Sequence, residues 1–316
     1  MTAVFLTIDT ELMWRHHAAG LALDEIVARS LEPGGVGVGY QLAVLARHGL
    51  KACFFVDPMP VPVHGAAPFA RLVAAILAAG QEVQLHLHPN WTGAAAGARG
   101  DAAGFELGDY PPDEQSALIA RARDLIEAAG APRPIAFRAG SYAAGDATLD
   151  ALAALGFAYD SSHNGADAPW PSAIGLPREQ IAPVAHRGLI ELPVTLIADL
   201  PGQLRPFQIC ALSAAEMRAA LDHAEAERHA AVVIVSHGFE LANRAGTRVN
   251  RVHRARFDAL CALLAERRDT LPMLHFGDRP TLTLGQADAP LAPSQLRTRL
   301  RQAEQLWSNL VEERAA

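Results

Sequence analysis

Short apolar runs rich in β-branched and aromatic residues recur along the chain and alternate with longer Ala- and Leu-rich stretches. Such short runs predict buried strands, and apolar positions at intervals of three and four residues predict amphipathic helices. The predicted strands are 4–8, 52–56, 83–87, 135–137, 158–159, 190–196, 231–235 and 273–276. The predicted helices are 38–48, 69–79, 114–129, 147–155, 214–228 and 254–267.

The alternation of strand and helix predicts βαβ units and a parallel sheet, hence an α/β protein. Because the strands are almost continuously apolar, we expect helices to cover both faces of the sheet. Seven or eight strands are compatible with an open doubly wound sheet and with a closed barrel, and the pattern alone leaves both open. No internal repeat beyond this alternation is visible.

Two long connections, 91–112 and 161–188, are rich in Gly, Ala, Pro and Asp, and loops of this length are more often functional than idle. After a linker at 286–294, apolar residues follow at spacings of four, three, four and three, which predicts an amphipathic terminal helix. These residues are Leu296, Leu300, Ala303, Trp307 and Leu310. A helix folded back on the body is favoured over a dimerisation stripe, so a homo-oligomer stays open. We therefore divide the chain into a main α/β domain, 1–285, and a linker with the C-terminal amphipathic helix, 286–316.

Composition narrows the class of protein. With 316 residues, 50% of them hydrophobic and 19% charged, the chain can build a large core, which excludes a disordered protein. Apolar stretches end before the roughly 20 residues that a membrane span needs, and the first residues lack the cationic start of an export signal. Three cysteines without a CxxC predict neither a disulfide framework nor a zinc knot. We expect a cytoplasmic protein, and the net charge of −7 argues against nucleic-acid binding.

Carboxylates and imidazoles follow two of the predicted strands in pairs. Asp9 and Glu11 come after the first strand, and alternation points both to one side. Converging carboxylates need a cation or a bound proton, although one of them could instead cap the next helix. His86 and His88 close the third strand in the same way. Two imidazoles with one or two carboxylates form a ligand set suited to zinc or a related divalent ion.

Three further strands also end on ionisable residues: Arg138 on the fourth, Asp160 on the fifth and His237 on the seventh. A buried arginine needs a carboxylate partner, which could be an ordinary ion pair at the sheet edge. A histidine at a strand end can exchange protons near neutral pH. Because active sites of parallel α/β folds lie at the carboxyl ends of the strands, this coincidence over five strands predicts an active site.

Five segments, taken in order, resemble the five motifs of the NodB-homology polysaccharide deacetylase family. They are TIDTE at 7–11, QLHLHP at 84–89, FRAGSY at 137–142, YDSS at 159–162 and VSH at 235–237. The resemblance spans roughly residues 1–280. It implies a distorted (β/α)7 barrel, to which the C-terminal helical tail is added.

Carried over residue by residue, the resemblance implies that Asp9 is the catalytic base and His237 the acid. It implies that Glu11, His86 and His88 hold a divalent metal, with zinc expected. Whether Asp9 or Glu11 supplies the carboxylate ligand stays open.

The remaining motif residues take supporting roles by the same resemblance. Arg138 would tether the base, and Asp160 would orient His237. We expect Trp91, Ser141 and Tyr142 to contact the substrate, with the two long loops selecting it.

The sequence departs from the family pattern at three positions. The usual histidine spacing of four residues would use position 90, which holds Asn90, so the HxH pair supplies the ligands or Asn90 replaces one. Thr10 stands where the commonest form has an aspartate, which leaves the ligand role to Glu11. His163 and Asn164 follow the fourth motif in place of its usual tryptophan.

The resemblance implies a metal-dependent hydrolase that removes an N- or O-acyl group from a carbohydrate or glycoconjugate. Two alternatives remain from the sequence: a catalytically silent barrel that binds carbohydrate, and a metal-dependent barrel lyase or isomerase.

Overall fold

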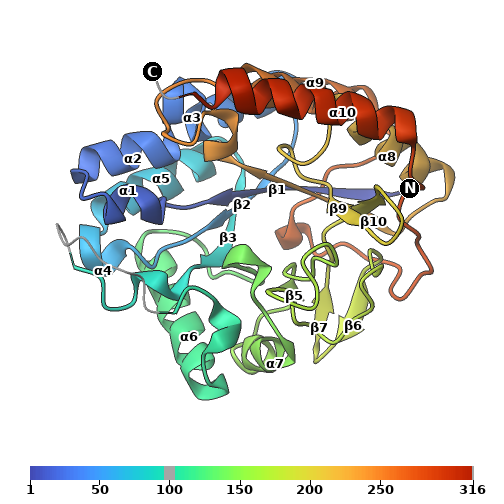
Figure 1. Cartoon of the computed structure of the whole chain (residues 1–316). Helices are drawn as coiled ribbons and strands as arrows, with labels where there is room; N and C mark the ends of the chain where they lie inside the picture. Colours follow the sequence, from blue (N-terminus) through green and yellow to red (C-terminus); the bar gives the residue numbers. More distant parts are fainter. Residues whose placement is uncertain (96–103, 315–316) are drawn as a thin grey trace.

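The computed structural model of the chain describes residues 1–95 and 104–314. Its main sheet has the strand order β10-β1-β2-β3-β4-β5-β7-β6, and within the described residues seven of these strands are parallel (Figure 1). The last strand, β6, runs antiparallel to β7, and a separate hairpin is formed by β8 and β9. The strands are β1 Ala3–Thr10, β2 Cys53–Val56, β3 Glu82–Leu87, β4 Ala136–Ala139, β5 Tyr159–Asp160, β6 Val184–His186, β7 Leu189–Glu191, β8 Leu196–Ala198, β9 Leu204–Pro206 and β10 Ala231–His237.

The sheet curls until its two ends approach, and the chain between β7 and α8 closes the gap. The backbone N–H of Thr195 donates to the carbonyl of Val233, and that of Val235 donates to the carbonyl of Phe207. Gln208 adds a single bridge to Val235. The predicted distorted barrel is therefore confirmed, with irregular backbone standing in for one regular strand pairing.

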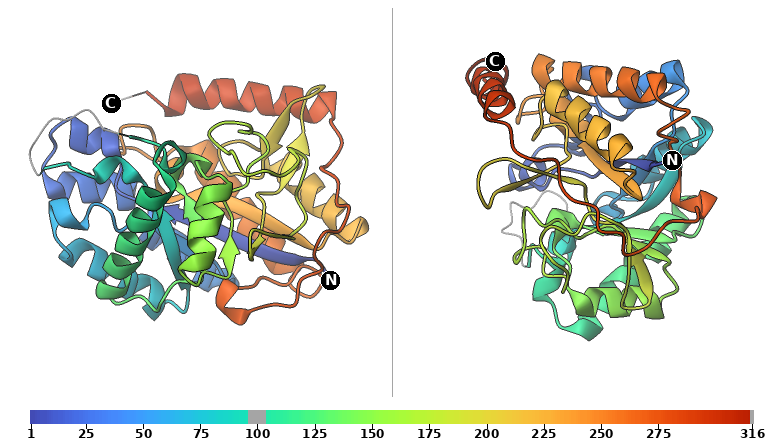
Figure 2. Two further views of the ribbon diagram at one scale, coloured as in Figure 1. Left: turned by 90° about the horizontal axis from the view of Figure 1, so that it is seen from below. Right: turned by 90° about the vertical axis from the view of Figure 1, so that its right-hand side faces the viewer.

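Helices surround the curled sheet (Figures 1 and 2). The six helices predicted in the main domain and the predicted terminal helix all form, whereas α1, α2 and α4 were not predicted. None of the helices in the described residues is long and apolar enough to cross a membrane. The helices are α1 Trp14–Ala18, α2 Leu23–Leu31, α3 Val38–His48, α4 Val61–His64, α5 Ala67–Ala78, α6 Pro112–Ala128, α7 Asp146–Ala154, α8 Ala214–Ala226, α9 Arg251–Glu266 and α10 Gln295–Trp307.

Two strand predictions were wrong in part. The run 190–196 divides into the end of β7 and the start of β8, with Pro193 between them, because proline has no N–H to donate to a ladder. The run 273–276 forms only an isolated bridge, from Met273 to Val4. It follows Pro272 and then turns into a short 3₁₀ helix, Phe276–Asp278, which leaves no length for a strand.

Alternation along β1 separates the two sides of the sheet. Val4, Leu6 and Ile8 belong to the core between sheet and helices, whereas Phe5 packs inside the barrel against aromatic and small side chains. The same inward register continues into Asp9, so the barrel interior becomes polar towards the carboxyl ends of the strands. Polar side chains are thereby concentrated at one end of the barrel.

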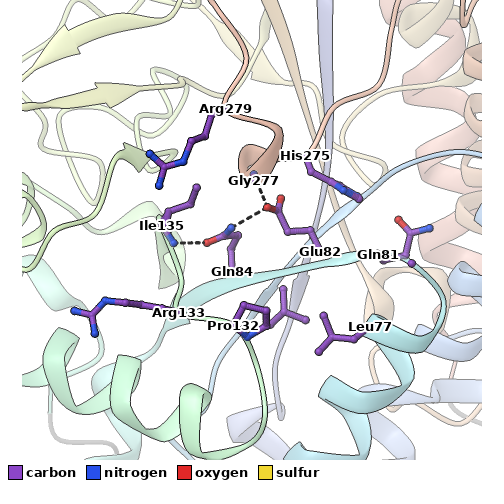
Figure 3. Close-up of a pocket in the computed structure, with 12 residues that line it drawn as sticks. Leu77, Gln81, Glu82, Gln84, Pro132, Arg133, Ile135, His275, Gly277 and Arg279 are labelled. Carbon is purple, nitrogen blue, oxygen red and sulfur yellow. Dashed lines mark hydrogen bonds between the residues drawn. The ribbon is translucent and has the colours of Figure 1, made fainter.

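A cavity of about 520 Å³ lies at the opposite end, by the amino ends of β3 and β4 (Figure 3). The Gln84 amide links three segments there, because it accepts from Ile135 N–H at 2.8 Å and donates to Glu82 at 3.0 Å. Glu82 in turn accepts from Gly277 N–H at 2.6 Å. These hydrogen bonds join β3, the start of β4 and the 3₁₀ helix, so the polar residues of this cavity have a structural role.

The terminal helix α10 packs against the body through its polar side. Thr298 and Arg301 are its buried residues. Arg301 donates to both carboxylate oxygens of Asp199 at 2.8 Å and to Glu216 at 3.1 Å. Thr298 also donates to Asp199, at 2.7 Å. The helix folds back on the body as expected, but the predicted apolar side is not the side that packs.

Replacing Arg301 with Ala removes the cation between two buried carboxylates. We expect α10 to undock more often, with its amide hydrogens exchanging about 10- to 30-fold faster, or about 1.5–2 kcal/mol. Hydrogen exchange of the intact chain measures this. Arg299, which is exposed on the same helix, is the matched control, and Arg299→Ala should change the exchange free energy by less than about 0.5 kcal/mol. Equal exchange in both variants would contradict polar docking.

Candidate active site

A cavity of about 380 Å³ lies at the carboxyl ends of the strands and brings most of the predicted site residues together. It is smaller than the cavity at the amino ends, but carboxylates and imidazoles line it. The predicted residues that line it are Asp9, Glu11, His86, His88, Ser141, Tyr142 and His237. The lining residues that were not predicted are Ala139, Gln208, Cys210, Phe239 and Glu240.

Glu11, His86 and His88 form a group of possible metal ligands. One ligand atom from each lies within 4.8 Å of the others. His86 Nδ1 donates to the Arg138 carbonyl at 2.8 Å, which leaves Nε2 as the free lone pair. Burial lowers the pKa of His86 to about 4, so this imidazole is neutral at neutral pH.

The other two residues of this group, Glu11 and His88, form an ion pair. His88 Nε2 lies 2.5 Å from Glu11 Oε2. Burial disfavours both charges, but the attraction between them prevails, so the pKa of Glu11 falls to about 2 and that of His88 rises to about 9. One carboxylate and two imidazoles are a donor set that fits a divalent cation such as zinc, with the proton on His88 given up on binding.

Asp9 is held by Arg138 inside the barrel. The guanidinium donates to Asp9 Oδ1 at 2.8 Å and to Thr7 Oγ1 at 2.7 Å. Burial would raise the pKa of Asp9, but the charges of Arg138, His86 and His237 together outweigh it and lower this pKa overall. Asp9 is therefore an ionised carboxylate whose second oxygen is turned to the cavity.

His237 faces Asp9 from the neighbouring strand. The two residues are register partners in β10 and β1, and His237 Nε2 lies 3.6 Å from Asp9 Oδ2. On the other side of the ring, Nδ1 lies 2.9 Å from Glu240 Oε1. Burial opposes the imidazolium, yet the carboxylates of Glu240, Asp9 and Glu11 together outweigh it and raise the pKa of His237 to about 9. The histidine thus carries a proton at neutral pH.

The predicted pairing of Asp160 with His237 was wrong. Tyr159 points into the barrel, so alternation turns the next residue, Asp160, to the outer side. There its carboxylate accepts from the N–H and the hydroxyl of Ser162, at 3.0 and 2.8 Å. Its register partner is Glu191, whose pKa is raised well above its usual range by burial and by the Asp160 charge. Glu240 takes the place beside the histidine.

The predicted substrate contact of Trp91 was also wrong. Its side chain is buried and packs against Trp14, His17 and His64 in an aromatic cluster. Asn90, offered as an alternative ligand, is buried and does not line the cavity.

The two long loops do not line the cavity either. The loop 161–188 and the described part of 91–112 contribute no lining residue, and 96–103 lies outside the described residues. The expectation that these loops select the substrate therefore has no contact to support it in the described part of the chain.

The segment after β4 has an unusual backbone. Ser141 and Tyr142 have φ angles of 54° and 59°, in the left-handed region that non-glycine residues seldom adopt. Gly140, just before them, lies under the His88 ring, since a Cβ there would be 2.3 Å from ring atoms. This glycine leaves room for the histidine, and the strained turn directs two side chains to the cavity.

Sequence reasoning missed the hydrogen-bond partner of His237, although a signal existed. Glu240 follows His237 by three residues, and His237 ends a strand. In a short helical turn, a side chain at this spacing folds back onto the residue that precedes the turn. Gln208 and Cys210 also donate to Glu240 and come from the closing segment, which no pattern in the sequence places there. Asp57, fully buried near Glu11 and His88, was missed as well, and burial raises its pKa to about 7.

Comparisons with known proteins agree with the predicted resemblance. No family model matches the chain. A curated relative, the peptidoglycan deacetylase-like protein FGM2 of Gibberella zeae, is 30% identical over 139 residues. This match covers 43% of this chain and 35% of the relative, so the chain spans about a third of the length of the relative it matches.

Solved structures match over nearly the whole chain. A protein described as a polysaccharide deacetylase from Mycobacterium smegmatis has a TM-score of 0.51 at 18% identity, covering 96% of this chain and 91% of its own. A second, from Pseudomonas aeruginosa PAO1, has a TM-score of 0.53 at 14% identity, covering 87% and 89%. The chain thus has the fold of polysaccharide deacetylases. A 4-α-glucanotransferase from Thermococcus litoralis, with a TM-score of 0.53 at 10% identity over 89% of this chain and 41% of its own, shares that fold, so the fold alone does not define the reaction.

Gly140→Ala places a methyl group where the His88 ring lies. We expect the ring to shift and the affinity for a divalent cation to fall about 10- to 100-fold, as when a ligand loses its support. Titration with Zn²⁺ against a competing chelator measures this. Gly108→Ala is the matched control, because its Cβ would meet its nearest neighbour at 3.7 Å. Unchanged Zn²⁺ affinity in Gly140→Ala would remove His88 from the ligands.

Proposed function

We propose that this protein is a metal-dependent hydrolase that removes an acetyl group from a carbohydrate. One observation carries the proposal: a carboxylate with two imidazoles, a buried ionised aspartate and a protonated histidine all line one cavity. The sequence match to a peptidoglycan deacetylase-like protein and the shared fold support the substrate class. Zinc is the expected cation.

The residues divide the chemistry among them. Glu11, His86 and His88 would hold the cation, which when bound polarises an acyl carbonyl and lowers the pKa of water. Asp9, kept ionised by Arg138, accepts the proton of the attacking water. His237, kept protonated by Glu240, gives its proton to the departing amine or alkoxide.

The opposite protonation states of Asp9 and His237 suit them to the roles of base and acid. Asp9 has a lowered pKa and His237 a raised one, so near neutral pH the first can accept a proton and the second can donate one. Ser141 and Tyr142 border the cavity and are placed to contact the sugar. An N-acetyl and an O-acetyl substrate differ only in the leaving group that His237 must protonate.

Metal content and acetate release test the proposal together. Protein purified without chelator and loaded with Zn²⁺ should release acetate from an acetylated oligosaccharide panel, and a chelator should stop it. Asp9→Asn should keep the metal but lose turnover about 10²- to 10⁴-fold, because the amide cannot accept a proton. The double variant His86→Ala, His88→Ala should lose the metal itself.

Two results would count against this function. Unchanged metal content in the double histidine variant contradicts the ligand assignment. Bound metal with no acetate from any sugar of the panel contradicts the reaction and favours a silent carbohydrate-binding barrel.

Leaving-group dependence tests the pairing of His237 with Glu240. His237→Ala and Glu240→Gln should each lower kcat on an amide, by about 10²-fold or more and about 10-fold respectively, with smaller losses on an activated ester that needs no proton. The double variant should be little worse than His237→Ala alone, as for residues that act as a unit.

The control for this prediction is Asp160→Asn, which should leave the ratio of amide to ester rates unchanged, even if less protein folds. Fully additive losses in the double variant, or equal losses on amide and ester, would refute the role of Glu240.

A further inference from the structure

The terminal helix α10 leaves its apolar side uncovered. Five large apolar residues on this helix and just after it are 52–69% exposed. They are Leu296, Leu300, Leu306, Trp307 and Leu310. With Ala303 these residues form what we call the α10 stripe. Both views in Figure 2 place α10 at the outer edge of the molecule, where a second molecule can approach it.

We infer that the α10 stripe is a homodimer interface, in which two copies of the chain pair their α10 helices antiparallel. Within α10, the spacings of four, three and four from Leu296 to Trp307 are those of a two-helix seam in which side chains of facing helices interlock. Leu310 follows on the π-helical turn Ser308–Glu312. The docking of α10 through Arg301 and Thr298 orients this seam outward on a fixed support. A helix held in this way loses little further entropy on pairing.

The size of the stripe fits such an interface. From the exposed fractions, the stripe presents roughly 600 Å² of apolar surface, at the upper end of what monomers leave in one patch. Two stripes face to face would bury about 1,200 Å², the lower limit for specific protein interfaces. We therefore expect a reversible dimer rather than an obligate one.

The order of residues favours the antiparallel arrangement about a two-fold axis at Ala303. Leu300 and Leu306 lie three residues either side of it, so each would face the other across the pair. Leu296, seven residues before the axis, would lie beside Leu310 of the partner subunit, on the π-helical turn Ser308–Glu312. The small side chain at the axis lets the two backbones approach. The stripe is thus complementary to itself.

A second copy fits the stripe better than a membrane surface does. The stripe is bordered on one side by neutral amides, Gln295, Gln302 and Asn309. Of the three arginines on α10, Arg301 is used in docking on the body, which leaves two cations, Arg297 and Arg299, outside the docked side. A helix that binds anionic lipid needs cations along its border, and the chain as a whole carries a net charge of −7.

Sedimentation equilibrium of the full chain, up to concentrations on the order of 100 μM, tests the proposal. We expect a mass approaching twice 33.6 kDa. Leu300→Glu and Trp307→Glu should each raise the dissociation constant at least tenfold, with unchanged circular dichroism because both side chains are exposed. Leu284→Glu is the matched control, since Leu284 is an exposed leucine away from the stripe, and it should dimerise as the parent does.

Disulfide crosslinking tests the direction of pairing. Ala303→Cys should form a disulfide-linked dimer, because the two copies meet at this residue. Leu296→Cys should not, because the same residues meet at that position only in a parallel pair. The proposal would be overturned by a monomer at all concentrations or by dimers that survive both glutamate substitutions. It would equally be overturned by crosslinking through Leu296→Cys, or by a monomer that binds anionic phosphatidylserine vesicles through the stripe.

Discussion

The buried ion pair of Arg138 and Asp9 is the interaction on which the candidate site depends. Removing these charges from water costs several kcal/mol each, so such a pair persists only where other hydrogen bonds complete it. Arg138 meets this condition, since it also donates to Thr7 and to both the carbonyl and the hydroxyl of Ser161. Its guanidinium lies 4.6 Å over the Phe55 ring. One side chain thus joins β1, β2, β4 and the turn after β5 around the carboxylate that acts as base in the proposed reaction.

The rest of the site repeats this principle on the neighbouring strand. Glu240 holds His237 as Arg138 holds Asp9, and the parallel register of β1 and β10 sets the two held residues side by side. Because each has its own partner of opposite charge, Asp9 stays ionised and His237 stays protonated, although Asp9 Oδ2 and His237 Nε2 are only 3.6 Å apart. Geometry and proton occupancy are therefore prepared before a substrate arrives.

Surface helices usually bury their apolar side and expose their polar side, and α10 does the opposite. The helix binds its own body through Arg301 and Thr298, and leaves leucines and a tryptophan in solvent. Asp199 is the reason that the polar side docks. A buried carboxylate needs hydrogen-bond donors, and residues of α10 donate three hydrogen bonds to Asp199. The apolar side then remains available for a partner.

The sequence by itself determined the alternating elements, the six helices predicted in the main domain, the terminal helix and the residues that gather at the carboxyl ends of the strands. It could do so because apolar periodicity is local, and because parallel strands bring residues such as Asp9 and His86 to one edge. The tertiary structure alone decided which neighbours meet. Alternation in a two-residue strand turned Asp160 outward, an irregular closing segment brought Gln208 to Glu240, and an aromatic cluster buried Trp91. It also decided which side of α10 docks, since the buried Asp199 that draws Arg301 inward lies about a hundred residues earlier in the chain. Contacts across such distances follow from packing and from the pairing of buried charges, which no local pattern records.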